Sequence, residues 1–314
     1  MANAASFLTE MTRKMMERVE RSGMPPLHQQ SVEQARMSYR VGVGAMEGER
    51  VELPRVEDFS IPGPVGDIPA RLWAPSTDPC LPVLLYLHGG GFIVGGIDTC
   101  EGMCRRIAQQ SGAAVVAIDY RLAPEHHFPA GLDDAFAALQ WLVSNGVSLG
   151  LDPARIAVGG DSAGGTLTAS VALMARDAGL KLALQVLFYP SVEPSAVTES
   201  YKAFSKNLML DEHLMRWFES QARGPGFKSD WRREPMLAAS HQGLAPAWIG
   251  LAECDPLADE GRKYAKVLQE AGVPVQLTVW PGVVHDFINM GRFIPEAFQA
   301  HAAVALALKA AFGL

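Results

Sequence analysis

Two pentapeptides of the chain have the pattern Gly-x-Ser-x-Gly, in which a serine hydroxyl can act as a nucleophile. The serines are Ser162, within residues 160–164, and Ser148, within residues 146–150. Ser162 follows the apolar run 155–159 and precedes a stretch of small residues suited to a tightly packed helix. A sharp turn from strand to helix exposes the serine, and flanking glycines relieve the crowding there. Ser148 follows a helix stop and precedes a turn, so Ser162 is the candidate nucleophile and Ser148 a loop serine.

A serine nucleophile needs a base within hydrogen-bond reach and an acid that orients the base. Of the eight histidines, only His285 directly follows the last predicted strand, at residues 275–280. A histidine at the carboxyl end of that strand can reach the nucleophile across the top of a sheet. Taken alone, His285 is as typical of a surface residue as of a base, but the serine and a nearby acid favour the base.

The acid is expected at the end of the preceding strand. Asp255 lies where the apolar run 247–251 gives way to a helix, and Glu253 is the alternative acid. Asp259 and Glu260 fall in the first turn of that helix, where carboxylates favour the helix dipole without any catalytic role. The resulting chain order of serine, aspartate and histidine is the order expected on this type of sheet.

A glycine-rich segment offers a place for negative charge. Residues 88–92, His-Gly-Gly-Gly-Phe, follow the apolar strand 83–87 directly. The amides of Gly90 and Gly91, together with that of Ala163, are candidates for binding the oxyanion of a tetrahedral intermediate. A phosphate-binding interpretation is disfavoured, because the segment lacks the Lys-Ser/Thr of a P-loop and the spacing of a dinucleotide fingerprint.

From residue 51 onward, strands and helices alternate, which predicts an α/β fold with a mostly parallel eight-stranded sheet and helices on both faces. Such a sheet places its functional loops at the carboxyl ends of its strands. The predicted strands are 51–61 and 65–73 (an opening hairpin), 83–87, 113–118, 155–159, 182–188, 247–251 and 275–280, and the predicted helices are 99–110, 131–143, 163–178, 257–271 and 296–311.

Two segments do not follow this alternation. Residues 1–50 are predicted to form the N-terminal part of a cap, and residues 191–235 a cap insertion. The catalytic domain then consists of residues 51–190 and 236–314. Because the cap segments do not belong to the sheet, they are free to cover its catalytic edge.

An apolar stripe runs along the first predicted helix, formed by Leu8, Met11, Met15 and Val19. Ordinary core packing is the favoured interpretation, and a substrate-lining role is the alternative. An amphipathic membrane helix is a third interpretation, but acidic residues dilute the basic face that it would need.

Composition limits the partners. The chain has 314 residues, of which 48% are hydrophobic, and its net charge is −7 with scattered Lys and Arg, which argues against nucleic-acid binding. The four cysteines have no zinc-site spacing, so we expect reduced thiols and no metal. No secretory signal and no apolar stretch of about 18 residues is visible. We therefore expect a cytoplasmic protein without a stable membrane anchor.

Five motifs occur in one order through the catalytic region. They are HGGGF at 88–92, YRLAPE at 120–125, GDSAGG at 160–165, DPLADEG at 255–261, and His285. With these motifs the chain resembles the hormone-sensitive-lipase-like esterases, also called bacterial lipase family IV, within the α/β-hydrolases. No direct chemical role for residues 120–125 follows from the residues themselves, and a structural role is the simpler interpretation.

The resemblance implies an α/β-hydrolase core under a helical cap and carboxylesterase activity without a cofactor. It also implies a possible homodimer, since many relatives dimerise, and it assigns both parts of the catalytic machinery. The residues concerned are Ser162, Asp255 and His285 for the triad and Gly90, Gly91 and Ala163 for the oxyanion hole.

The chain departs from the family pattern at two positions. Ala258 stands where the family usually has Arg, and Asp286 stands where Gly commonly follows the histidine. Neither position belongs to the triad. A carboxylate next to His285 is expected to raise the pKa of that histidine.

The sequence thus predicts a serine carboxylesterase that hydrolyses short- to medium-chain acyl esters, with a small-molecule acyl ester as its partner. A ligand-binding receptor on the same fold is one alternative, as in the plant gibberellin receptors, which lack a working triad histidine. A specialised amidase or deacetylase is the other. The natural acyl group and alcohol do not follow from the residues.

Overall fold

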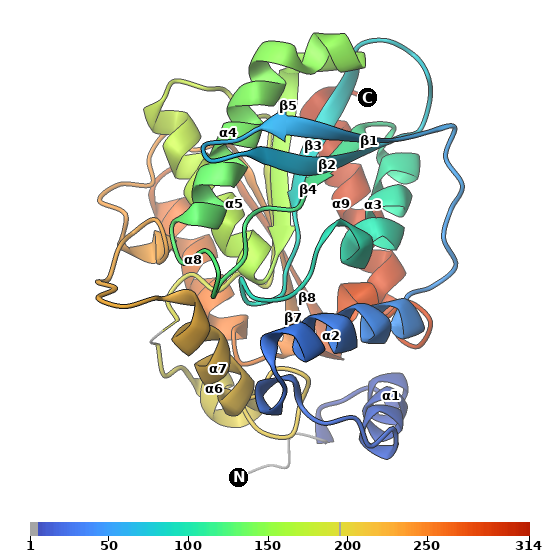
Figure 1. Cartoon of the computed structure of the whole chain (residues 1–314), viewed down its shortest axis with the longest axis vertical. Helices are drawn as coiled ribbons and strands as arrows, with labels where there is room; N and C mark the ends of the chain where they lie inside the picture. Colours follow the sequence, from blue (N-terminus) through green and yellow to red (C-terminus); the bar gives the residue numbers. More distant parts are fainter. Residues whose placement is uncertain (1–5, 195) are drawn as a thin grey trace.

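A computed structural model describes residues 6–194 and 196–314, which fold around one sheet (Figure 1). In the described residues this sheet has eight strands in the order β1-β2-β4-β3-β5-β6-β7-β8. The strands are β1 (Arg55–Pro62), β2 (Asp67–Ala74), β3 (Leu81–Leu87), β4 (Ala114–Ile118), β5 (Leu151–Asp161), β6 (Gln185–Phe188), β7 (Ala247–Cys254) and β8 (Val275–Val284).

The sheet is parallel except at one edge. The hairpin β1–β2 is antiparallel, and β2 also pairs antiparallel with β4, whereas every pair from β4 to β8 is parallel. All residues of β3, β4 and β6 are buried, as expected for strands covered on both faces. The predicted α/β fold with a mostly parallel eight-stranded sheet is confirmed.

Helices cover both faces of the sheet, with α3 and α9 against one face and α4 and α5 against the other (Figure 1). No helix in the described part of the chain is long and apolar enough to cross a membrane. The α-helices are α1 (Glu10–Arg21), α2 (Val32–Met46), α3 (Ile97–Ser111), α4 (Ala130–Asn145), α5 (Ala163–Asp177), α6 (Glu199–Phe204), α7 (Glu212–Ala222), α8 (Ala258–Glu270) and α9 (Glu296–Phe312), and a short 3-10 helix, η2, spans Leu27–Gln29.

The last two strands are longer than the apolar pattern predicts. β7 and β8 continue to Cys254 and Val284, and these two residues pair with each other beyond an irregularity in the register. The sequence signal ended early because Pro281 and Gly282 are typical of a turn. The extension matters for the site, because the next residues, Asp255 and His285, then emerge from neighbouring strand ends.

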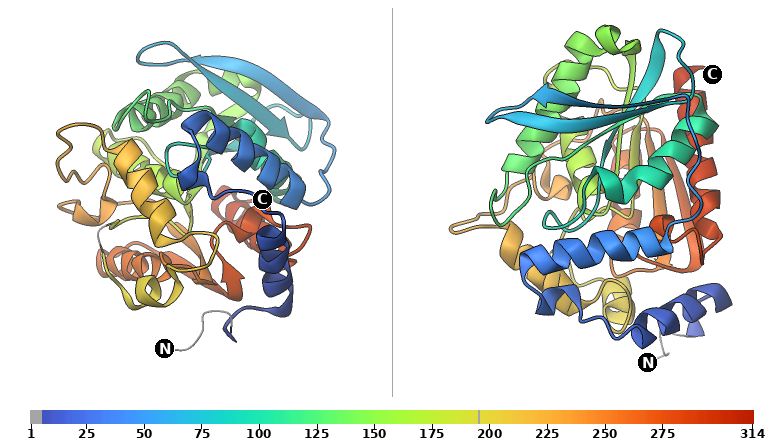
Figure 2. Two further views of the ribbon diagram at one scale, coloured as in Figure 1. Left: turned by 60° about the horizontal axis from the view of Figure 1, so that its bottom comes forward. Right: turned by 45° about the vertical axis from the view of Figure 1, so that its right-hand side comes forward.

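The segments outside the sheet gather at one end of the molecule, where α1, η2, α2, α6 and α7 lie near one another (Figures 1 and 2). The N-terminal segment and the insertion touch, since the rings of His28 and His213 stack with centroids 5.6 Å apart. Residues 1–5 and 195, which belong to the predicted cap segments, lie outside the described residues.

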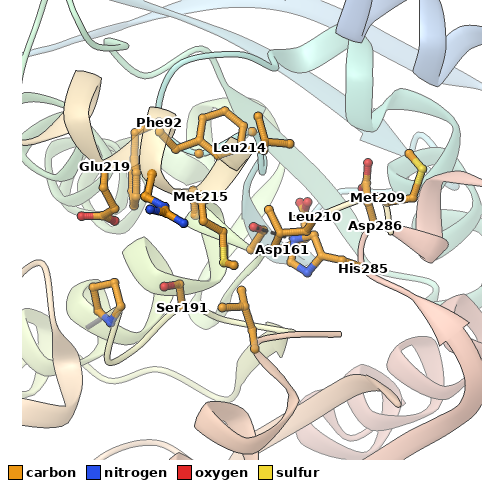
Figure 3. Close-up of a pocket in the computed structure, with 18 of the residues that line it drawn as sticks. Phe92, Asp161, Ser191, Met209, Leu210, Leu214, Met215, Glu219, His285 and Asp286 are labelled. Atoms are coloured by element: carbon orange, nitrogen blue, oxygen red, sulfur yellow. Dashed lines mark hydrogen bonds between the residues drawn. The ribbon is translucent and has the colours of Figure 1, made fainter. Parts of the chain in front are cut away.

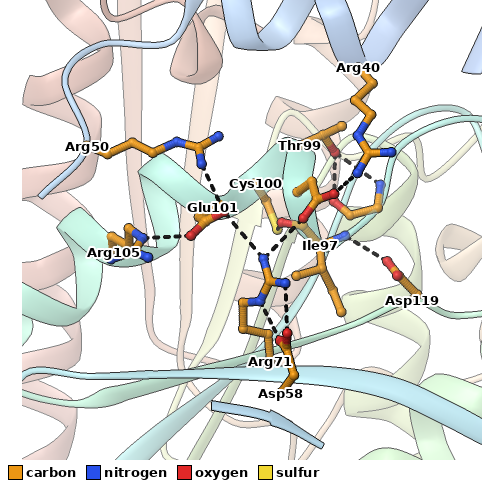
Figure 4. A network of polar contacts seen from close by, with 12 residues as sticks. Arg40, Arg50, Asp58, Arg71, Ile97, Thr99, Cys100, Glu101, Arg105 and Asp119 are labelled. Carbon is orange, nitrogen blue, oxygen red and sulfur yellow. Dashed lines mark hydrogen bonds and ion pairs between the residues drawn. The ribbon is translucent and has the colours of Figure 1, made fainter. Parts of the chain in front are cut away.

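A network of ion pairs fastens α2 to the core (Figure 4). Glu101 on α3, whose side chain is only 8% exposed, accepts hydrogen bonds from Arg50 and from Arg71 on β2 at 3.1 and 3.4 Å. Arg71 also donates to Asp98 at 3.1 Å, and Asp98 pairs in turn with Arg40 on α2. Because several charges share a partly buried site, this network fixes α2 better than isolated surface pairs would.

Candidate active site

Ser162 occupies the turn between β5 and α5 in a strained conformation, with φ 53° and ψ −117°. The turn brings the backbone close to β3, so that a Cβ on Gly160 or on Gly164 would overlap the carbonyl oxygen of Leu87. Only glycine fits at these two positions. Ser148, by contrast, is exposed in a 3-10 turn and donates to Asn145 O at 2.7 Å.

A chain of hydrogen bonds links the three predicted side chains. His285 Nε2 lies 2.9 Å from Ser162 Oγ, and His285 Nδ1 lies 2.6 Å from Asp255 Oδ2. Asp255 is fully buried, and its other oxygen accepts the amide of Leu257 at 2.9 Å. With Asp255 on Nδ1, the neutral tautomer leaves Nε2 free to accept a proton from the serine.

The other acids considered in the sequence have different partners. Glu253 accepts a hydrogen bond from the amide of Gly282 at 2.8 Å, which ties β7 to β8. Asp259 accepts the amide of Ser200, and Glu260 accepts the amides of Val192 and Glu193. Glu260 is nonetheless buried beside the site, and burial raises its pKa to about 7.

Three charges act on His285. Burial is the largest single effect and lowers the pKa of this histidine, but the charge and hydrogen bond of Asp255, together with the charges of Asp286 and Asp161, outweigh burial and raise the pKa above its usual value. Asp286 is held in the left-handed region at φ 67°, where it accepts a hydrogen bond from Asn289 at 2.7 Å. Burial and the neighbouring Asp161 raise the pKa of Asp286 to about 7.

The three predicted amide donors share a cavity with Ser162. Gly90, Gly91 and Ala163 all line the cavity that contains Ser162. Within the described residues, none of their N–H groups donates to another protein group. Gly90 and Gly91 have positive φ angles of 113° and 61°, a backbone course that L side chains rarely adopt. These three amides can therefore donate hydrogen bonds to an oxyanion that forms on a substrate bonded to Ser162.

Asp161 positions the glycine loop, a role that the sequence analysis missed. Its Oδ1 accepts hydrogen bonds from Tyr86 Oη at 2.6 Å and from the amide of Gly89 at 3.0 Å. Burial raises the pKa of Asp161 to about 6, although both hydrogen bonds favour the ionised form. The sequence signal was its place as the second residue of the GDSAGG motif, directly before Ser162.

The YRLAPE segment braces the same loop from the other side. Tyr120 donates to the carbonyl of His88 at 2.7 Å, and the two rings stack with centroids 4.3 Å apart. Arg36 of α2 donates to the carbonyls of Ile93 and Ala123. The motif therefore supports the backbone of the glycine loop, which agrees with a structural role.

The cavity around Ser162 has a volume of about 280 Å³. Figure 3 shows Met209, Asp286 and His285 toward one end, and Phe92 and Glu219 toward the other. Both predicted cap segments contribute to its walls. None of the four stripe residues lines this cavity. Met15 is buried in the core with Leu8 and Val19 packed against it, whereas Met11 is 45% exposed, so core packing describes most of this stripe. Met15 and Val19 also line a second cavity, which is described below.

Known proteins resemble the chain over most of its length. The model of the α/β-hydrolase fold family matches residues 84–289. An ethyl acetate hydrolase of Pseudomonas putida is 39% identical over 291 residues, which span 90% of this chain and 92% of the relative. The carboxylesterase NlhH of Mycobacterium tuberculosis is 42% identical over 256 residues, which span 78% of this chain and 79% of the relative.

Solved structures agree along almost the whole chain. A serine-to-alanine mutant of an α/β hydrolase from the metagenome of Lake Arreo superposes with a TM-score of 0.95 at 38% identity, covering 98% of this chain and 100% of that structure. A hyperthermophilic esterase from Pyrobaculum calidifontis superposes with a TM-score of 0.91 at 37% identity, covering 96% and 98%. The chain therefore belongs to the α/β-hydrolase fold family, within the hormone-sensitive-lipase-like carboxylesterases.

The close approach at the nucleophile turn generates a stability prediction. Gly164→Ala should lower the free energy of unfolding by about 3 kcal/mol, because its Cβ overlaps backbone atoms of β3 that have no room to move. Gly44→Ala, in open space on α2, should instead raise it by about 0.5–1 kcal/mol. Urea denaturation of both variants measures the difference, and equal stabilities would contradict the packing argument.

Proposed function

We propose that this protein is a serine carboxylesterase that hydrolyses short- to medium-chain acyl esters through an acyl-enzyme intermediate. The observation that carries the proposal is the hydrogen-bonded chain from Ser162 through His285 to Asp255, open to a cavity with three free amides. The relatives are named as hydrolases of carboxylic esters, and ester hydrolysis is the activity of this protein as well.

The first half of the reaction forms the acyl-enzyme. Ser162 Oγ attacks the ester carbonyl carbon while His285 Nε2 takes the hydroxyl proton. The carbonyl oxygen becomes an oxyanion, which the amides of Gly90, Gly91 and Ala163 stabilise. The bond to the alkoxy oxygen then breaks, and His285 gives its proton to the departing alcohol.

Water completes the cycle. His285 removes a proton from a water molecule, which attacks the acyl carbon, and the second tetrahedral intermediate collapses to release the acid and Ser162. Asp255 keeps the imidazole in one tautomer and stabilises its charged form in both halves. No step needs a cofactor.

The cap, we propose, consists of the segments 1–50 and 191–235, and the remainder forms the catalytic domain. Support comes from the described parts of both segments, which line the cavity through Leu27 and Tyr39 on one side and Leu214 and Phe218 on the other. A cap that covers the site in this way excludes water and supplies apolar walls for the substrate.

A cytoplasmic location is the environment that we infer for the enzyme. All four cysteines are free thiols, three of them buried, and a reducing compartment preserves free thiols. The homodimer implied by the family resemblance stays a prediction. No observation favours the receptor or the amidase alternatives, and the paired His285 counts against the receptor.

The nucleophile is tested by exchanging each motif serine. Ser162→Ala should lower kcat for p-nitrophenyl butyrate by about 10⁴- to 10⁶-fold, because attack by the hydroxyl is lost. Ser148→Ala is the matched control and should change kcat less than about twofold, since that serine is exposed and distant in the fold. Undiminished turnover by the Ser162 variant would refute the assignment of Ser162 as the nucleophile.

The acid is tested with isosteric amides. Asp255→Asn should lower kcat by about 10³- to 10⁴-fold, because the amide favours the wrong imidazole tautomer. Glu253→Gln should lower kcat much less, because Glu253 accepts a hydrogen bond from the amide of Gly282 rather than from the imidazole. If Glu253→Gln costs more activity than Asp255→Asn, the orienting acid is Glu253.

The charge of Asp286 is tested through the pH profile. His285 acts as a base only when neutral, so kcat/KM falls as the pH drops through its pKa. Because the negative charge of Asp286 helps to raise that pKa, Asp286→Asn should move the acid limb of the profile to lower pH. The difference in kcat/KM between the wild type and the variant should be largest near neutrality, since the pKa of Asp286 itself is about 7.

Asparagine suits the left-handed backbone at this position, so the variant isolates the charge. Asp67→Asn, an exposed carboxylate in the β1–β2 hairpin, gives the same change in net charge as a control and should leave the limb in place. A limb that moves to higher pH in the Asp286 variant would contradict the electrostatic account.

A further inference from the structure

A second cavity lies under the cap, next to the catalytic one. Its volume is about 800 Å³, and its walls come from α1, α2, the segment between them, and the segment that precedes α7. Apolar side chains dominate these walls, among them Met24, Val43, Met46, Leu208 and Phe293. The volume falls within the range of small-molecule sites, which is about 300–1,000 Å³.

The two cavities share a wall. Leu27, Tyr39, Met209, Leu214 and Asp286 line both of them. Tyr39 and Asp286 are joined by a hydrogen bond from Tyr39 Oη to Asp286 Oδ2, which is long at 3.3 Å. The partition is therefore made of a few side chains. Leu27, Met209 and Leu214 are apolar, and the unbranched Met209 can adapt to a passing chain.

The shared wall lies on the histidine side of the nucleophile. Asp286 follows His285 in the chain, and Met209 stands near Asp286 at that end of the catalytic cavity (Figure 3). The amide donors Gly90, Gly91 and Ala163 line the catalytic cavity but not the second one.

The chemistry of ester cleavage gives each side of the nucleophile a role. His285 Nε2 must deliver its proton to the alkoxy oxygen, so the alcohol portion of the ester has to leave past the imidazole. The oxyanion points to the amides on the other side. A chain attached to the alkoxy oxygen is then directed toward the wall that the two cavities share.

The volumes of the two cavities also favour a place for this chain in the second cavity. The catalytic cavity, about 280 Å³, is small for a whole ester with a long chain, whereas the second cavity is nearly three times as large. The acidic and basic residues on the second cavity are of both signs, namely Arg18, Glu20, Asp211, Asp286 and Arg292. A neutral, apolar chain therefore fits this cavity better than a charged group does.

We propose that the second cavity binds the alcohol portion of the substrate, so that the preferred substrates are esters of a short acid with a medium-length apolar alcohol. This inference rests on the proposed esterase function. It goes beyond it by assigning the two halves of the ester to two different cavities.

Two isomeric esters test the orientation without any change in composition. Octyl acetate and ethyl octanoate contain the same atoms and differ only in which half carries the long chain. The wild-type enzyme should hydrolyse octyl acetate with a kcat/KM about tenfold higher, since burying even two extra methylenes on the favoured side gives that factor. Acid release in a pH-stat, below the solubility limit of each ester, measures both.

Two glycines of α2 provide a matched pair of variants. Gly42 lines the second cavity and Gly44 does not, and a Cβ on either would meet no atom within 4 Å. Gly42→Trp should fill part of the cavity and remove the preference for octyl acetate over ethyl octanoate. Gly44→Trp, on the exposed side of the same helix, should keep the wild-type preference.

The outcomes separate this inference from the proposed function. No hydrolysis of ethyl acetate by the wild type would overturn the esterase function itself. Hydrolysis of ethyl acetate with an equal or reversed rate for the two isomers would overturn only the assignment of the alcohol to the second cavity. A Gly42→Trp variant that slows ethyl octanoate and spares octyl acetate would place the acyl chain there instead.

Discussion

The close approach of two backbones sets the geometry of the site. At Gly160 and Gly164 the turn after β5 comes so near to the carbonyl of Leu87 that no side chain fits between them. This approach holds Ser162 at φ 53°, a conformation that costs about 1–3 kcal/mol and persists only because the surroundings enforce it. The strain directs the hydroxyl out of the sheet, where the imidazole meets it at 2.9 Å.

The same contact places the three amides that we propose as oxyanion donors. Because α5 packs on the end of β3, the amide of Ala163 and the glycine loop after Leu87 come to face one cavity. Asp161 then fastens the start of that loop through Gly89, and Tyr120 fastens it through His88. A hole made of backbone amides has no rotamers to fix, so its accuracy depends on such hydrogen bonds behind the loop.

The sequence predicted the sheet, and it predicted the three residues that the structure joins in one chain of hydrogen bonds, because both depend on local signals. Apolar runs mark buried strands, and each triad residue directly follows one of them in chain order. The sequence missed what depends on contacts between distant segments. No local sequence pattern indicates that Tyr120 contacts His88, 32 residues earlier in the chain. Likewise, the full length of β7 and β8 follows from the pairing of Cys254 with Val284, which lie far apart in the sequence.

Two carboxylates flank His285, and their surroundings give them different roles. Asp255 is fully buried, bonded to the imidazole and to an amide, and so it remains a fixed partner of the ring. Asp286 faces both cavities, lacks any cationic partner among its described hydrogen bonds, and has a pKa raised to about 7. The charge at the wall that the two cavities share therefore varies around neutral pH. For the substrate chain that we propose to cross this wall, desolvation costs least when Asp286 is protonated, whereas the charged form of Asp286 strengthens the base. In this proposal Asp286 sets binding of the chain against histidine basicity, a coupling that a glycine at this position would not have.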